Sequence, residues 1–237
     1  MKPKLWNSLQ KLGEKYAVSI PETWENEPLP LFPWRMERRF VELRNLIQEK
    51  TVEEVVLGRF SCNVQKGYKT LREVLFRELD LGRWMLGTDL EGLYAAITEL
   101  ESGESFANVL VRWTNGVVCS IEAGTTLKKG ASRPFLDRHE WVGRRGVASD
   151  RVVDTQIPQE SVYVYTSETT QHFTDTDAEL FGLEENEIAW VRSAWELAQN
   201  PSLRETWQRQ QEQLHAWVDL ALTSASEKQY RTMGGAT

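Results

Sequence analysis

The stretch Phe106–Leu127, FANVLVRWTNGVVCSIEAGTTL, decides the fold class of this 237-residue chain. Two apolar runs with rough alternation flank the dipeptide Asn115-Gly116. Alternation with a period of two is typical of a β-strand that buries one face. Because an Asn-Gly pair readily adopts the positive φ angles of a tight hairpin, the stretch predicts two adjacent antiparallel strands.

Further strand patterns lie on both sides of this hairpin. VEEVVLGRFSCNV (52–64) and LEGLYAAITELE (90–101) precede it and combine β-branched residues with rough alternation. HEWVGRRGVASDRVVDTQI (139–157) carries a Gly-bearing turn between short strands, and SVYVYT (161–166) adds another strand. The polar stretch TSETTQHFTDTDAE (166–179) indicates a loop.

Apolar residues with helical spacing surround this strand-rich middle. The predicted helices cover residues 5–17, 37–50, about 70–86, 183–199 and 203–225, and Asn200-Pro201 separates the last two. Because hairpins give antiparallel sheets and the apolar helix stripes must be buried, the fold class is α+β. We expect an open, mostly antiparallel sheet with helices packed on one face.

The prolines predict how the chain is divided. Four of them between Pro21 and Pro33 forbid a helix there and favour an extended connector. We therefore expect three parts: residues 1–36 as an N-terminal helix plus connector, residues 37–230 as the α+β domain, and residues 231–237 as a frayed tail.

The composition excludes some classes of binding partner and indicates a cellular compartment. A formal net charge of −7 argues against nucleic acid and against anionic membrane surfaces. No stretch approaches the roughly 18 apolar residues of a membrane span, and the charged N-terminus is unlike a secretory signal. Cys62 and Cys119 lie in apolar runs, which predicts buried free thiols in a cytoplasmic protein, although a disulfide between them stays open.

Motifs for cofactors and metals are missing from the sequence. There is no GxGxxG, P-loop or GxSxG pattern, and the three histidines have no metal-ligand spacing. We therefore expect no metal site and no cofactor bound by this chain alone.

The helix LREVLFRELDLGRWMLG (71–87) resembles the form D-L-G-x-H-D-I-D-L-x-R-W-L-L-G of the Gfo/Idh/MocA oxidoreductases. SFANVLVRWTNGVVCSIEAGTT similarly resembles the Asn-Gly hairpin in the C-terminal domain of that family, and the likeness spans residues 37–230. It implies an open sheet whose exposed face often makes subunit contacts. The family also has an N-terminal Rossmann domain for NAD or NADP, and residues 1–36 resemble just its last helix and strand.

One departure from the family falls on its catalytic pair. The pair D-x-x-x-H aligns with Glu73 and Arg77, and the family's histidine exchanges a proton with the reacting hydroxyl. An arginine, whose pKa exceeds 12, cannot do this near neutral pH, so no catalytic residue is predicted with confidence. The spacing of Glu73 and Arg77 instead favours a helix ion pair.

Three interpretations of the polar residues on this helix stay open. In the first, Glu73, Arg77 and Asp80 form a solvated or paired helix face. In the second, they contact a ligand, and Arg77 holds an anionic group of it. In the third, they take part in acid/base chemistry. Trp34 and Arg35 are further candidates for ligand binding, because their segment lies close to substrate in the family.

Three hypotheses for the function follow. The chain is a non-catalytic pseudoenzyme-like domain that binds a protein partner or forms a homo-oligomer through its sheet face. Alternatively, it is the C-terminal half of an NAD(P)-dependent sugar or cyclitol dehydrogenase whose nucleotide domain lies elsewhere. The third hypothesis is a module for small anionic ligands, with Arg77 as the anchor.

Overall fold

The computed structural model describes residues 2–128, 134–150, 161–166, 170–174 and 183–233. The chain divides into two compact units, one formed by Met1–Val41 with Asp175–Gln213 and the other by Glu42–Thr174 with Leu214–Thr237. The sequence predicts boundaries after residues 36 and 230, which divide the chain into consecutive segments. Each compact unit combines two distant stretches of chain, so the predicted boundaries stay a prediction.

The first unit is helical. It contains α1 (Pro3–Tyr16), the 3₁₀ turns η1 (Glu22–Glu25) and η2 (Pro33–Met36), α4 (Glu185–Gln199) and the start of α5 (Leu203–Glu227). The Pro-rich connector forms short 3₁₀ turns and no α-helix, as its prolines require. Apolar side chains from α1 and α4 meet in a small core, which contains Leu5, Leu183, Ile188 and Val191.

The second unit is built on one large sheet. Within the described residues the strand order is β8-β7-β6-β5-β1-β4-β3-β2-β9. The neighbours are antiparallel except for the central pair β1–β4, which is parallel. This confirms the predicted α+β class with a mostly antiparallel open sheet. The strands are β1 (Val55–Gln65), β2 (Leu90–Glu99), β3 (Ser105–Trp113), β4 (Val118–Leu127), β5 (Phe135–Gly143), β6 (Gly146–Ser149), β7 (Ser161–Thr166), β8 (Thr170–Thr174) and β9 (Arg231–Thr232).

The hairpin between β3 and β4 forms where the sequence predicts it. Gly116 has a φ of 86°, which a residue with a side chain rarely adopts. The Trp113 amide donates to the carbonyl of Val117 at 2.9 Å, and the Val117 amide donates to the Asn115 side chain at 3.2 Å. The Asn-Gly pair therefore turns the chain as predicted.

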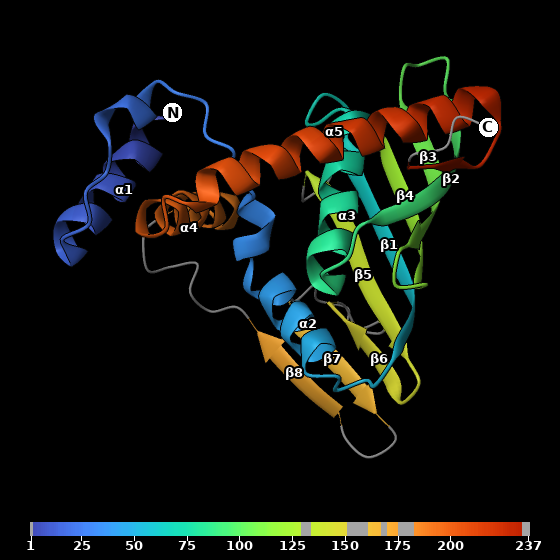
Figure 1. Cartoon of the computed structure of the whole chain (residues 1–237). Helices are drawn as coiled ribbons and strands as arrows, with labels where there is room; N and C mark the ends of the chain where they lie inside the picture. The colour runs from blue at the N-terminus through green and yellow to red at the C-terminus, as the bar shows by residue number, and fades with distance from the viewer. Residues whose placement is uncertain (1, 129–133, 151–160, 167–169, 175–182, 234–237) are drawn as a thin grey trace. The chain divides into compact units, whose positions relative to one another are not determined.

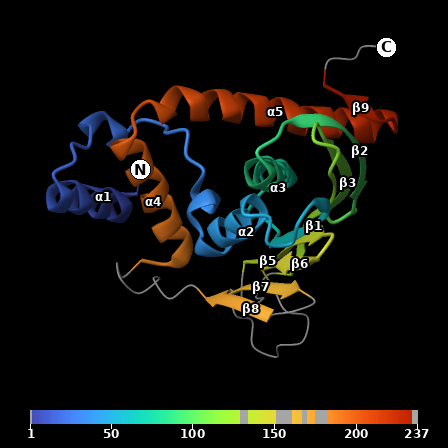
Figure 2. The same ribbon diagram turned by 60° about the horizontal axis from the view of Figure 1, so that its bottom comes forward.

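Helices cover one face of this sheet. Alternate residues of β3, Ala107, Val109, Val111 and Trp113, are buried against α3 (Leu71–Leu86) and the part of α5 from Leu214 onward. Figure 2 shows α3 on the concave side of the curved sheet. Helix α2 (Arg38–Gln48) contributes Gln48, which donates to the carbonyl of Met85 at 2.8 Å. No described helix of this unit lies over the opposite face, as Figure 1 also shows.

Two local predictions are wrong. Residues 170–174, predicted as part of a loop, form β8, whose residues pair with β7 (Tyr163 opposite His172). Pairing with a neighbouring strand satisfies the backbone of this polar segment, and its threonines suit an extended chain. The predicted frayed tail contributes β9, which pairs with Gly92 and Leu93 of β2. The predicted strand residues 151–157 lie outside the described residues.

The described part of the chain contains no candidate for a membrane-spanning helix. None of the helices there combines the length and the apolar character that crossing a bilayer requires.

Candidate functional site

Helix α3 carries three of the candidate residues, Glu73, Arg77 and Asp80, and its sequence determines both of its ends. Thr70 and Glu73 form a capping box: Glu73 N donates to Thr70 Oγ1 at 3.3 Å and Thr70 N donates to Glu73 Oε2 at 2.7 Å. Gly87 ends the helix in the left-handed conformation. All residues from Val74 to Gly82 are buried, so the charged residues among them, Arg77, Glu78 and Asp80, lie inside the protein.

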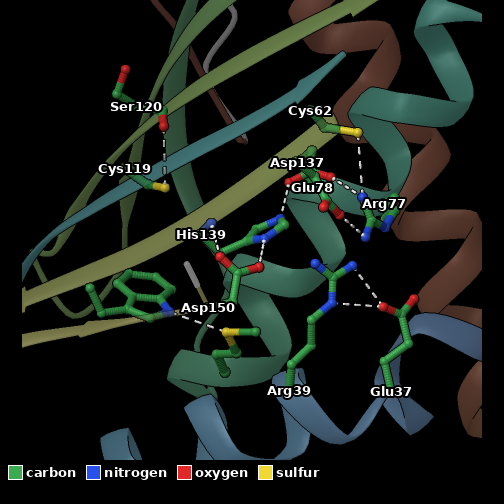
Figure 3. A network of polar contacts seen from close by, with 12 residues as sticks. Glu37, Arg39, Cys62, Arg77, Glu78, Cys119, Ser120, Asp137, His139 and Asp150 are labelled. Atoms are coloured by element: carbon green, nitrogen blue, oxygen red, sulfur yellow. Dashed lines mark hydrogen bonds and ion pairs between the residues drawn. The ribbon is translucent and has the colours of Figure 1, made fainter. Parts of the chain in front are cut away.

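Arg77 belongs to a buried ion network, which we define as Arg77, Glu78, Asp137, His139 and Asp150 (Figure 3). The Arg77 guanidinium donates to Asp137 Oδ2 at 2.6 Å and to Glu78 Oε1 at 3.0 Å. Its side chain is 7% exposed and both carboxylates are fully buried. The guanidinium therefore links α3 to strand β5.

His139 on β5 lies between two carboxylates. Its Nε2 is 2.8 Å from Glu78 Oε2 and its Nδ1 is 2.8 Å from Asp150 Oδ2. Asp150 is also tied to the backbone of His139, since its Oδ1 accepts from His139 N at 2.7 Å and its own amide donates to His139 O at 3.1 Å. Complete burial lowers the pKa of His139, but the charges and hydrogen bonds of Glu78 and Asp150 outweigh it and raise the pKa to about 9.

The two cysteines are free and buried, as the sequence predicts. Cys62 Sγ lies 3.4 Å from Arg77 Nη1. Burial, followed by the charge of Glu78, raises the pKa of both thiols, so each stays protonated near neutral pH. Neither is therefore poised as a nucleophile.

The predicted ion pair between Glu73 and Arg77 is wrong. The Glu73 carboxylate accepts from the amide and the hydroxyl of Thr70, and the backbone hydrogen bond lowers the pKa of Glu73. Arg77 is paired with Asp137 and Glu78 instead. The spacing of four residues permits a pair, but the cap and the buried carboxylates offer each side chain a better partner.

The other candidate residues lie in different surroundings. Asp80 is fully buried on α3 in the second unit. Trp34 and Arg35 belong to the first unit, where both pack around Phe32: the Arg35 guanidinium carbon lies 3.7 Å from the ring centroid of Phe32 and the ring of Trp34 lies 5.8 Å from it. Arg35 also donates to Gln210 at 2.9 Å. Ligand contacts by Glu73, Arg77, Asp80, Trp34 or Arg35 stay a prediction.

Sequence reasoning missed four of the five network residues. Glu78 follows Arg77 directly, and Asp137 and His139 alternate with Trp141, which places all three on one face of β5. That alternation was a usable signal, because charged residues at the buried positions of a strand need partners. Their partners on α3 and after β6 follow from the tertiary structure.

The described residues offer neither a metal site nor, at α3, a cradle for a dinucleotide pyrophosphate. In the described part of the chain, no group of three or more His, Cys, Asp or Glu side chains could hold a metal ion. A dinucleotide pyrophosphate needs a Gly-rich turn at the N-terminus of a helix. At α3 the Glu73 carboxylate already occupies that end and would repel a phosphate. The N-terminus of α3 therefore does not fit a dinucleotide pyrophosphate.

No known family model and no curated protein matches the sequence. Solved structures match its fold. An oxidoreductase from Agrobacterium radiobacter, in complex with NAD+, L-tartaric acid and magnesium, has 15% identity and a TM-score of 0.66, over 85% of this chain and 64% of that one. An inositol dehydrogenase homologue from Azotobacter vinelandii, complexed with NADH and myo-inositol, has 12% identity and a TM-score of 0.64, over 85% and 63%.

An oxidoreductase from Pseudomonas syringae has 12% identity and a TM-score of 0.64, over 84% of this chain and 62% of that one. This chain thus spans less than two thirds of the length of these structures. The likeness confirms the predicted resemblance at the level of the fold: this chain folds like part of the Gfo/Idh/MocA-type oxidoreductases.

Proposed function

We propose that the chain is a non-catalytic domain derived from an oxidoreductase, which assembles with a second copy of itself through the open face of its sheet. The open face is the side of β1–β5 over which no described helix lies. Its residues are Arg59, Ser61, Asn63, Tyr94, Ala96, Asn108, Leu110, Arg112, Ser120, Glu122, Leu136, Arg138 and Glu140.

The single observation that carries the non-catalytic part is the environment of Arg77. The family resemblance places this residue at the acid/base position, where a guanidinium cannot exchange protons near neutral pH. Asp137 and Glu78 already neutralise its charge in a buried setting. The same pairing counts against Arg77 as an anchor for a free anion, because a ligand would have to displace two buried carboxylates.

Large apolar side chains on the open face support the assembly part. Tyr94, Leu110 and Leu136 are 40%, 53% and 46% exposed, and Tyr94 lies directly opposite Leu110 in the β2–β3 ladder. Exposed apolar groups that adjoin one another on a sheet mark an interaction surface more often than scattered ones do. We therefore place the centre of the contact on β2 and β3.

The charges of the open face favour a second copy as the partner. Arg59 and Arg138 both donate to Glu140, at 2.9 and 2.6 Å, and the face contains arginines but no lysine. Arginine is enriched at protein interfaces, whereas lysine is depleted. A surface that carries both signs of charge can be complementary to itself, which a two-fold symmetric dimer requires.

A pair of leucine substitutions tests the proposal. Leu110→Glu introduces a charge in the open face, whereas Leu100→Glu alters a similarly exposed leucine (48%) just after β2, outside this face. Sedimentation velocity over a concentration series should show dimers for the wild type and for Leu100→Glu, and monomers for Leu110→Glu. A monomeric wild type, or an equal effect of both substitutions, would contradict assembly through this face.

A second candidate is the substrate-binding half of an NAD(P)-dependent sugar or cyclitol dehydrogenase whose nucleotide domain lies elsewhere. It is favoured by a similar structure that holds NADH with myo-inositol, since this chain covers 63% of the length of that structure. Titration of NADH, followed by its fluorescence, tests the second candidate in one direction, because the absence of binding to this chain alone fits both candidates. Tight binding to this chain alone would favour the dehydrogenase. Since both thiols are free, we also propose a reducing, cytoplasmic location.

A further inference from the structure

We infer that His139 is held as an imidazolium cation, and that this buried charge locks helix α3 to strand β5 and to the end of β6. The lock consists of the contacts from His139 to Glu78 on α3 and to Asp150 directly after β6. It is independent of the proposed assembly, since the His139 ring points to the helix-covered side of the sheet.

The geometry requires two donors on one ring. Both ring nitrogens lie 2.8 Å from a carboxylate oxygen, and an ionised carboxylate can accept hydrogen bonds but cannot donate them. A neutral imidazole has one N–H, so it would leave one of these contacts as a lone pair facing a negative oxygen. The ring must therefore carry two protons, unless one of the carboxylates is itself protonated.

The charges around His139 favour the imidazolium. Helix α3 contributes Arg77 and Glu78, β5 contributes Asp137, the residue after β6 is Asp150, and β1 contributes the protonated thiol of Cys62. Within the buried ion network, a charged His139 gives two cations for three carboxylates. A neutral His139 would remove one of the two cations that lie beside these buried carboxylates, and the loss of a buried partner is costly.

The contacts join segments that are far apart in the sequence. Glu78 and His139 are 61 residues apart, and the loop from His139 to Asp150 contains the β5–β6 hairpin. Asp150 is held at three points, by the ring of His139 and by both backbone groups of that residue. If His139 lost one ring proton, one of its two 2.8 Å contacts with carboxylate oxygens would become repulsive. We therefore expect the packing of α3 against β5 to weaken in alkaline solution.

Two amide substitutions should produce opposite neutral forms of the ring. In Asp150→Asn the backbone amide of His139 needs the remaining oxygen, so the NH₂ group faces Nδ1 and leaves the proton on Nε2. In Glu78→Gln the Arg77 guanidinium needs the oxygen, so the NH₂ group faces Nε2 and leaves the proton on Nδ1. Glu140→Gln is the matched control, because it removes a carboxylate from the opposite face of the same strand.

Nitrogen-15 NMR of the full chain, with the histidine rings labelled, reports directly which ring nitrogens carry a proton. A His172→Gln/His215→Gln background leaves His139 as the sole histidine, since the sequence contains three. At pH 7.5 we expect both ring nitrogens to be protonated in this background and in the Glu140→Gln control. At the same pH, Asp150→Asn and Glu78→Gln should show the neutral Nε2–H and Nδ1–H tautomers respectively, so the midpoint of the His139 titration should fall from about 9 to below pH 7.5.

One protonated ring nitrogen at pH 7.5 in the background protein would overturn the inference, because the second proton would then belong to a carboxylate. The same tautomer in both amide variants would overturn it as well. If an amide variant fails to fold, the spectrum of the background protein still decides, since it reports the number of protons on the ring.

Discussion

Asp137 Oδ2 lies 2.6 Å from Nη2 of Arg77, so strand β5 neutralises the residue that the family resemblance places at the acid/base position. Both groups are almost completely shielded from water. A buried pair of this kind adds little to stability compared with well-packed apolar residues, but breaking it is costly. The loss of stability on removal of one partner is therefore the quantity to measure.

Substitution of Arg77 by methionine should destabilise the fold strongly. Asp137 and Glu78 would remain buried without their cation, and such a loss costs about 3–5 kcal/mol. The free energy of unfolding from urea titrations at pH 7 measures the effect. Arg72→Met is the control, since Arg72 pairs with Asp219 at an exposed site where an ion pair contributes about 1 kcal/mol or less. Equal costs for the two variants would contradict the buried pairing.

Gly82 should not tolerate even a methyl group. A Cβ at this position would lie 2.5 Å from a ring carbon of Trp113, which is fully buried and also contacts the ring of Trp217. In Gly82→Ala the overpacking, about 1–3 kcal/mol, should exceed the gain of about 1 kcal/mol in helix propensity. Urea unfolding measures the balance, and near-UV circular dichroism should report a displaced Trp113. A more stable protein with an unchanged spectrum would show that the ring moves aside at no cost.

Stability should fall in alkaline solution because of His139. Its pKa is raised from 6.5 to about 9 in the folded protein, so its contribution is complete below about pH 6.5 and is lost as the pH rises through about 9. The total is on the order of 3 kcal/mol, since each pKa unit corresponds to about 1.4 kcal/mol. Unfolding free energies between pH 6 and 10 measure it. The fall should be smaller in Asp150→Asn, and an identical profile for both proteins would assign the loss to other groups.

The thiols should react slowly in the folded protein. Burial raises the pKa of Cys62 and of Cys119, which reduces both access and the thiolate fraction at pH 8. With a disulfide reagent that releases a coloured thiol, we expect both to react at a rate set by unfolding, and quickly in denaturant. Fast reaction of one thiol before unfolding, assigned with Cys62→Ser, would show an opening near that strand.

Much of the fold could be predicted from local patterns. The Asn115-Gly116 turn and the helix stop at Gly87 depend on neighbouring residues, and the structure has both. The Thr70–Glu73 cap is equally local, but the sequence pattern predicts a pair of Glu73 with Arg77 instead. Strands β8 and β9 escaped prediction because their extended form depends on pairing with β7 and β2, which their polar sequences do not reveal. The same limit applies to the site. Arg77 was identified from its departure from a motif, whereas its partners Asp137 and Glu78 follow from packing between helix and strand.

The position of β1 in the sheet has a consequence during translation. The ribosome makes β1 (Val55–Gln65) before the other strands of this sheet, yet its neighbours β4 and β5 begin at Val118 and Phe135. One edge of β1 therefore lacks its native partner until the nascent chain has been extended through residue 127, and the other edge until it has been extended through residue 143. Unpaired apolar strands are prone to aggregate. Chaperone dependence should accordingly be greatest while β2 and β3 emerge, and should decline once β5 has left the exit tunnel.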